Sequence, residues 1–137
     1  MTRYYIDACI WRDYFEDRKD RFRPLGDWAF RFIKKIVEDE DEIIISDVLI
    51  KELDTHLGTE EVKSCLSFVP KTLIKYIKIS DAQERCAHRI KQRFGINFND
   101  SLHVVLAKDH DAILITRDKH FEVVERYVCV RKPEDLL

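Results

Sequence analysis

Four carboxylates spread along the chain, Asp7, Glu52, Asp100 and Asp118, have the residue type and the placement to perform chemistry together. Carboxylates gathered in a partly desolvated crevice repel one another, so such a group persists when divalent cations neutralise it. Oxygen ligands of this kind suit Mg²⁺ or Mn²⁺. These ions activate water, and a pair of them can hold both the attacking and the leaving oxygen of a phosphodiester. The predicted chemistry is therefore metal-dependent phosphodiester hydrolysis.

The segments that carry these residues predict strands alternating with helices. Short β-branched or aromatic runs predict strands at residues 3–7, 43–46, 73–79, within 111–118 and at 127–130. Helical spacing and capping residues predict helices at 10–16, from Asp27 to about 38, at 47–57, 60–69 and 80–94, from Asn97 or Asn99 to near His110, and from about Lys119. The pattern Ser80-Asp-Ala-Gln83 is a capping box, which makes the helix after it well defined.

This alternation predicts an α/β fold, a three-layer α/β/α sandwich around a mostly parallel sheet. A chain of 137 residues is the size of one ordinary domain, so residues 1–137 are expected to form a single domain. Functional crevices in such sheets lie beyond the carboxyl ends of the strands. Asp7 and Asp118 follow strands directly, and Glu52 and Asp100 can reach the same edge from their helices.

Composition limits the classes of function. The net charge of −2 means that a nucleic acid must be bound by a local basic patch. The candidate patch lies in the first helix-loop-helix region and consists of Arg18, Lys19, Arg21, Arg23, Lys34 and Lys35. The four cysteines lack the spacing of a zinc site, and no apolar run has the length of a signal peptide core or a membrane span. We therefore expect a cytoplasmic protein without a membrane segment.

Ordinary roles compete with the metal hypothesis. Acidic residues number 26 of 137, so the four carboxylates could be solvated or capping groups, and Asp100 in particular suits a helix N-terminus. Thr116 fits equally well as a strand-end residue and as a group that orients a carboxylate or water. For His103, a satisfied histidine on a packed helix face is favoured over a ligand or base. Spacing alone leaves these alternatives open.

The local sequences resemble the PIN-domain family of metal-dependent ribonucleases, which includes the VapC-type toxins. The blocks that carry the resemblance are YYIDACIW with Asp7, SDVLIKELDTHL with Glu52, NDSLHVVLAKDHDA with Asp100, and LITRDKHF with Thr116 and Asp118. The resemblance implies a sheet of strand order 3-2-1-4-5 and an Mg²⁺-dependent endonuclease for single-stranded RNA. It further implies that the four acids are catalytic metal ligands supported by Thr116, and that an antitoxin protein is a partner.

The sequence also departs from the family pattern. Ala8 and Cys9 replace the small hydroxyl residue usual after the first Asp, and His120 stands where an extra acidic or amide residue is usual. We therefore expect one firmly held ion and a second ion that is weaker or recruited by the substrate.

Two further hypotheses concern function and assembly. A PIN-like domain that binds RNA or protein without cutting is the main alternative, and a receiver-type signalling domain is disfavoured because a suitably placed Asp after the third strand is lacking. Apolar residues of the first two helices, Trp11, Phe15, Phe30 and Phe32, exceed the need of one sheet face, which predicts a homodimer or antitoxin surface.

Overall fold

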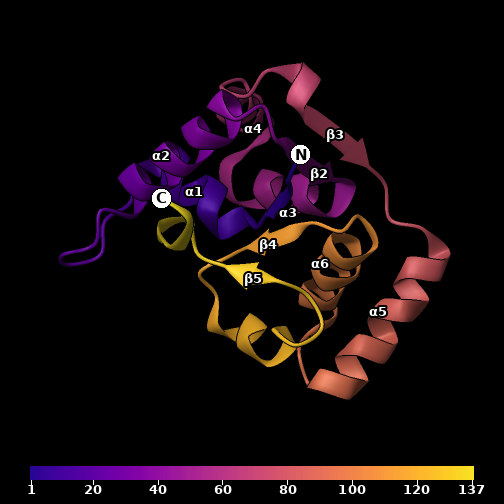
Figure 1. Cartoon of the computed structure of the whole chain (residues 1–137). Helices are drawn as coiled ribbons and strands as arrows, with labels where there is room; N and C mark the ends of the chain where they lie inside the picture. Colours follow the sequence, from indigo (N-terminus) through magenta and orange to yellow (C-terminus); the bar gives the residue numbers. More distant parts are fainter.

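The computed structural model describes all 137 residues and contains a five-stranded sheet whose strands are all parallel (Figure 1). The strands are β1 (Arg3–Ile6), β2 (Glu42–Ser46), β3 (Ile74–Ile77), β4 (Ile113–Ile115) and β5 (Val130–Arg131). Their order across the sheet is β3-β2-β1-β4-β5. The α/β class and the predicted strand order are confirmed.

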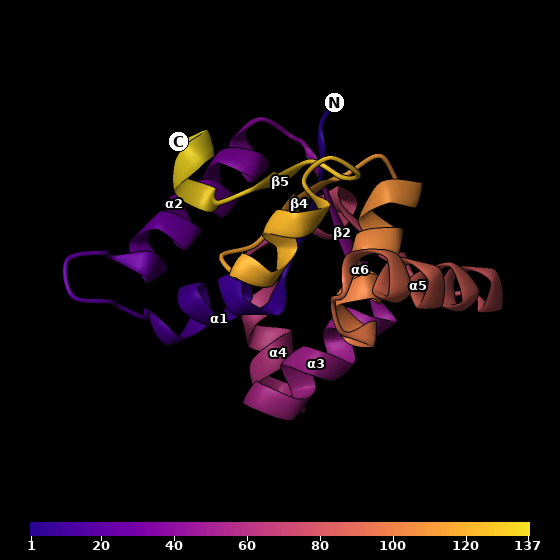
Figure 2. The same ribbon diagram turned by 90° about the horizontal axis from the view of Figure 1, so that it is seen from below.

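Helices cover both faces of this sheet, and α5 and α6 lie apart from α1 and α2 (Figures 1 and 2). The α-helices are α1 (Ala8–Glu16), α2 (Leu25–Glu38), α3 (Asp47–Leu57), α4 (Thr59–Leu66), α5 (Asp81–Phe94) and α6 (Phe98–Asp109). Three short 3-10 helices are η1 (Lys71–Leu73), η2 (Lys119–Val124) and η3 (Pro133–Leu136). None of the helices is long and apolar enough to cross a membrane.

Two hydrophobic clusters pack on the two faces of the sheet, and the central strands contribute to both. Successive side chains of a strand point to opposite faces, so Ile43 and Ile45 join the cluster under α1 to α4, whereas Ile44 joins the cluster under α5 and α6. This burial on both sides explains the continuous β-branched run in β2. Trp11 and Phe32 are fully buried in the first cluster, so including them in the predicted homodimer or antitoxin surface is wrong.

Most predicted elements lie where the sequence places them, and the differences have local causes. The capping box of Ser80 and Gln83 opens α5 as predicted. Asp27 does not cap α2, which begins two residues earlier at Leu25, so Asp27 lies in its first turn. The segment from Lys119 forms a 3-10 helix and not an α-helix, in keeping with its adjacent β-branched Val123 and Val124.

A group of charged side chains ties β4 to α1 and to the C-terminal segment. The guanidinium of Arg117 binds the carboxylate of Glu134 through two hydrogen bonds of 2.6 and 2.9 Å, and its Nε lies 3.5 Å from buried Asp13. Burial alone would lower the pKa of Arg117 and raise that of Glu134. The pairing outweighs burial, so the pKa of Arg117 lies above its ordinary value and that of Glu134 lies below it.

Replacing Glu134 by glutamine should therefore lower the free energy of unfolding by about 1–2 kcal/mol at pH 7. Because the folded pKa of Glu134 is lowered, its contribution is complete above the unfolded pKa of about 4.3 and is lost as the pH falls through the folded value. Urea unfolding at pH 7 and near pH 3 measures this difference. Glu38→Gln, which removes an exposed partner of Lys34, should change stability little at either pH. An equal penalty for Glu134→Gln at both pH values would contradict the ionic explanation.

Candidate metal centre

The four predicted acids meet at the carboxyl edge of the sheet. Asp7 follows β1 and caps α1, Asp118 follows β4 and caps η2, Glu52 lies in α3, and Asp100 lies in the first turn of α6. Their ligand atoms fall into two groups, and within each group all of these atoms lie within 4.8 Å of one another. One group contains Asp7, Glu52 and His103, and the other contains Asp100, Asp118 and His120.

Thr116 joins two of these carboxylates. Its hydroxyl donates a hydrogen bond of 2.9 Å to Oδ2 of Asp7 and accepts one of 3.1 Å from the backbone N–H of Asp118. The other oxygen of Asp7 accepts a hydrogen bond from the backbone N–H of Ala8, and Cys9 Sγ lies 3.3 Å from Oδ2. Thr116 thus fixes the loop after β4 against the end of β1.

Glu52 is held by two residues on one face of α6. Asn99 donates a hydrogen bond of 2.8 Å to its Oε1, and Nε2 of His103 lies 2.9 Å from its Oε2. Burial would raise the pKa of Glu52, but these hydrogen bonds and the nearby histidines hold it below its ordinary value. Burial would likewise lower the pKa of His103, and the bond to Glu52 outweighs it, so that the pKa of His103 is raised.

A chain of hydrogen bonds continues from Glu52 into the core. Nδ1 of fully buried His103 lies 2.6 Å from the hydroxyl of Tyr5, which in turn lies 2.7 Å from Ser46 Oγ. The backbone N–H of Leu49 must donate to Ser46, and the carboxylate of Glu52 must accept from His103. When the imidazole is neutral and donates to Glu52, its Nδ1 can only accept, so Tyr5 donates to His103 and Ser46 donates to Tyr5. In this arrangement every group of the chain has a hydrogen-bond partner. His103 is therefore a satisfied histidine, as predicted, that also orients a site carboxylate.

Asp100 is the carboxylate most affected by its neighbours. Its Oδ2 accepts a hydrogen bond of 3.0 Å from Asn97. Burial, and then the negative charges of Asp118 and Asp7, raise the pKa of Asp100 to about 6. A divalent cation would relieve this repulsion, and carboxylate oxygens are the ligands that Mg²⁺ and Mn²⁺ prefer. The residues present therefore fit a divalent cation of this class.

Sequence reasoning did not assign Asn99 or His103 to the site. The two residues are four positions apart, which places them on the same helix face. This spacing was the feature of the sequence that could have indicated their shared role. Their target, Glu52, was known only as a helix residue.

The predicted basic patch does not form as a unit. Arg18 binds Asp13 at 2.8 Å, and Lys35 donates to the carbonyl oxygen of Leu136. Lys34 pairs with Glu38. Arg23 alone of the predicted set lines a groove beside the carboxylates.

Two grooves are lined by residues of the carboxylate site or by their neighbours in the chain. A groove of about 480 Å³ includes Thr116 and Asp118, together with the basic residues Arg23, Arg117, Lys119, Arg131 and Lys132 and the acidic residues Glu122, Glu125 and Asp135. A second groove of about 420 Å³ contains Phe94, Asn97 and His120, and Lys119 lines both grooves.

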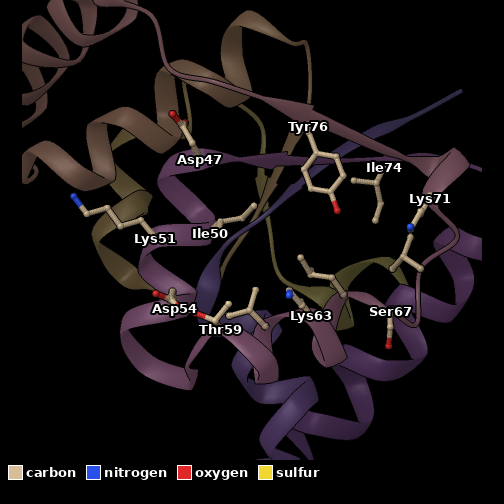
Figure 3. Close-up of a pocket in the computed structure, with 13 residues that line it drawn as sticks. Asp47, Ile50, Lys51, Asp54, Thr59, Lys63, Ser67, Lys71, Ile74 and Tyr76 are labelled. Carbon is tan, nitrogen blue, oxygen red and sulfur yellow. Dashed lines mark hydrogen bonds between the residues drawn. The ribbon is translucent and has the colours of Figure 1, made fainter.

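The largest groove lies away from the carboxylates. It has a volume of about 900 Å³ and is bounded by α3, α4 and β3 (Figure 3). Ile50 and Asp54 line it, and each is two residues from Glu52, about 200° around the helix. The groove and the carboxylate site therefore use opposite faces of α3.

The fold and the acidic edge define an α/β protein with a carboxylate site suited to divalent cations. A family model described as PIN domain matches residues 4–127, so this chain belongs to the PIN-domain family. The resemblance seen in the sequence is thereby confirmed. Comparison with curated protein sequences gives no significant match.

Several solved structures share this fold, and one of them is a toxin-antitoxin complex from Klebsiella pneumoniae. Rickettsia felis VapBC2, bound to a promoter DNA fragment, has a TM-score of 0.72 at 16% identity, covering 96% of this chain and 98% of that chain. Neisseria gonorrhoeae FitAcB has a TM-score of 0.65 at 14% identity, with coverages of 95% and 97%. Mycobacterium tuberculosis VapC20, a toxin that cleaves the sarcin-ricin loop, has a TM-score of 0.63 at 10% identity, with coverages of 90% and 95%. At these identities the likeness shows the fold.

Proposed function

We propose that this protein is a divalent-metal-dependent endoribonuclease that hydrolyses phosphodiester bonds of single-stranded RNA, and that it is the toxin of a toxin-antitoxin pair. The observation that carries the proposal is the meeting of Asp7, Glu52, Asp100 and Asp118 at one edge, with the pKa of Asp100 raised by burial and by its acidic neighbours. Family membership and the toxin-antitoxin structures of the same fold support it.

The chain's own residues divide the work in this proposal. Asp7, Glu52, Asp100 and Asp118 would hold Mg²⁺ or Mn²⁺, which supplies an activated water and stabilises charge on the phosphate. Thr116 keeps Asp7 and the Asp118 loop together, and His103 and Asn99 keep both oxygens of Glu52 in place. These contacts preorganise the carboxylates before any ligand arrives.

The grooves beside the carboxylates support a single strand as the substrate. Cationic side chains that line the groove of about 480 Å³, such as Arg131 and Lys132, can contact the phosphates of the strand. Phe94 and His120 line the other groove and offer flat surfaces on which an unpaired base can stack. Asp118 lines the larger of these grooves and Lys119 lines both, so a strand that follows them would pass one of the site carboxylates.

The direct test is cleavage of an end-labelled single-stranded RNA by the purified chain. We expect cutting with Mg²⁺ or Mn²⁺, no cutting with a chelator, and restored cutting when metal is returned in excess. A duplex of the same sequence should be cut more slowly, because its bases cannot stack in the groove. Cutting that survives chelation would contradict the metal mechanism. Metal binding with RNA binding but no cutting would favour the non-catalytic alternative.

An exposed aromatic cluster supports a protein partner. Tyr14, Phe30 and Phe68 bring α1, α2 and the end of α4 together, with ring centroids 5.5 to 6.3 Å apart. Phe30 is 38% exposed and Phe68 is 37% exposed, as is neighbouring Phe15. We assign this cluster to an antitoxin, because the structures of the same fold include toxin-antitoxin complexes.

If the gene has a small antitoxin-like reading frame as its neighbour, co-expression should yield a complex of the two proteins. Phe30→Asp should weaken that complex at least tenfold, because it places a charge in the aromatic cluster. Tyr76→Asp, a change at another exposed aromatic residue, should leave the complex intact. Light scattering of the chain alone should then give its mass of 16.4 kDa. A stable dimer that Phe30→Asp dissociates would assign the cluster to the homodimer instead.

A further inference from the structure

His120 lies beside two of the proposed metal-binding carboxylates. Its Nδ1 is 3.3 Å from Oδ1 of Asp118 and 3.8 Å from Oδ2 of Asp100. The backbone of His120 is held next to this site, because its N–H donates a hydrogen bond of 2.9 Å to the capping carboxylate of Asp118. The imidazole is 71% exposed and thus remains open to a ligand.

These separations suit atoms that share one ion. Neighbouring ligand atoms around an octahedral ion with bonds of about 2.1 Å lie about 3 Å apart. The distances from the imidazole exceed this value by less than 1 Å, which a small rotation of an exposed side chain can close.

The other histidine of the site cannot act in this way. His103 uses Nδ1 for Tyr5 and Nε2 for Glu52, at 2.6 and 2.9 Å, so neither nitrogen has a free lone pair directed at the site. His103 orients a carboxylate, whereas His120 is free to bind a cation.

We propose that His120 is a nitrogen ligand of the divalent cation held by Asp100 and Asp118, and that it makes this position selective for Mn²⁺ over Mg²⁺. This inference rests on the proposed metal-dependent function. Imidazole suits the first-row transition metals, whereas Mg²⁺ prefers oxygen donors throughout. An acid at the same position would complete an all-oxygen set. The histidine thus changes the choice of ion without removing the site.

The spectroscopic test uses Mn²⁺ alone on the full chain, prepared without a histidine tag. Pulsed electron paramagnetic resonance should detect a ¹⁴N nucleus coupled to Mn²⁺ at the strength of a directly bound imidazole. His120→Asn should lose this coupling, because it keeps a polar side chain and removes the ring. His88→Asn is the matched control, since His88 is exposed, lies in α5, which carries none of the four carboxylates, and stacks on Phe98. That variant should keep the coupling.

Binding titrations with Mn²⁺ and Mg²⁺ provide the second readout. The ratio of Mn²⁺ to Mg²⁺ affinity should fall about tenfold or more in His120→Asp, the scale of loss seen when even an outer-shell partner is removed. His120→Asp should bind Mg²⁺ at least as well as the unsubstituted chain. Circular dichroism melting of each variant should show that the fold is kept, since the ring of His120 is 71% exposed.

The outcomes separate this inference from the function on which it rests. Mn²⁺ binding without nitrogen coupling, or an unchanged ion preference in His120→Asp, would overturn the role of His120 and leave the metal-dependent function standing. In that case the imidazole is only a polar neighbour of Asp118 and Asp100. Failure of the unsubstituted chain to bind either ion would overturn the proposed function itself.

Discussion

Asp118→Asn should reduce RNA cleavage by about 100-fold or more, because loss of a metal ligand removes several kcal/mol of charge stabilisation from the transition state. The substitution isolates charge from shape. Oδ1 of Asp118 caps η2 by accepting from the backbone N–H of His120, and an asparagine oxygen performs the same capping role.

The fold of this variant should be as stable as that of the unsubstituted chain, or more stable, when no metal is present. The charge of Asp118 is one cause of the raised pKa of Asp100, so its removal relieves repulsion between carboxylates. Added Mg²⁺ or Mn²⁺ should stabilise the unsubstituted chain through binding linkage and stabilise the variant less. Function and metal-free stability should therefore change in opposite directions.

Cleavage assays and thermal melting with and without metal measure both effects. Asp39→Asn is the matched control: Asp39 is exposed at the end of α2, before β2, and so at the opposite edge of the sheet. It should cut RNA at the unsubstituted rate. Full activity of Asp118→Asn would remove this residue from the proposed metal-ligand set.

Gly26→Ala should destabilise the protein by about 3 kcal/mol, although the same change in an exposed helix usually stabilises it by about 1 kcal/mol. Gly26 lies at the start of α2, and its N–H donates a hydrogen bond of 2.8 Å to the carbonyl oxygen of Arg18. A Cβ atom there would lie 2.6 Å from the Cα of Asp17 and 2.8 Å from the carbonyl oxygen of Asp13. Both are backbone atoms, so the clash can be relieved only by moving α1 away from α2.

Urea unfolding of Gly26→Ala and Gly95→Ala distinguishes a clash from backbone strain. Gly95 has a φ of 72°, and a Cβ added there would have no neighbour within 4 Å. Its replacement should cost only about 1–2 kcal/mol, the penalty of the left-handed conformation. If Gly26→Ala were neutral or stabilising, α1 and α2 would have to pack with more freedom than the structure shows.

The sequence predicted the strands and the functional edge of the sheet well because both follow from chain-local patterns, whereas the strand order came from the family resemblance. Asp7 and Asp118 could be placed from the strands that precede them, since parallel strands end at a common edge. Glu52 and Asp100 lie in helices, and their orientation toward this edge was implied only by the family resemblance.

Contacts between helices were beyond the reach of such patterns. The pairing of Asn99 and His103 with Glu52 depends on how α6 packs against α3, which no spacing along the chain specifies. Trp11 and Phe15 illustrate the same limit at the surface. They are four residues apart in one aromatic stretch, yet Trp11 is fully buried and Phe15 is 37% exposed.

The hydrogen bond between Thr116 and Asp7 joins residues that are 109 positions apart in the chain. The site can therefore form only after the ribosome has made the residues between them. Asp7 is made first, and at about 5–20 residues per second the ribosome needs roughly 5–20 s more to make Thr116. Until then β1 lacks its neighbour β4, and Asp7 lacks the hydroxyl that positions it. A nascent chain therefore carries an incomplete carboxylate site until β4 and the residues that follow it have been made.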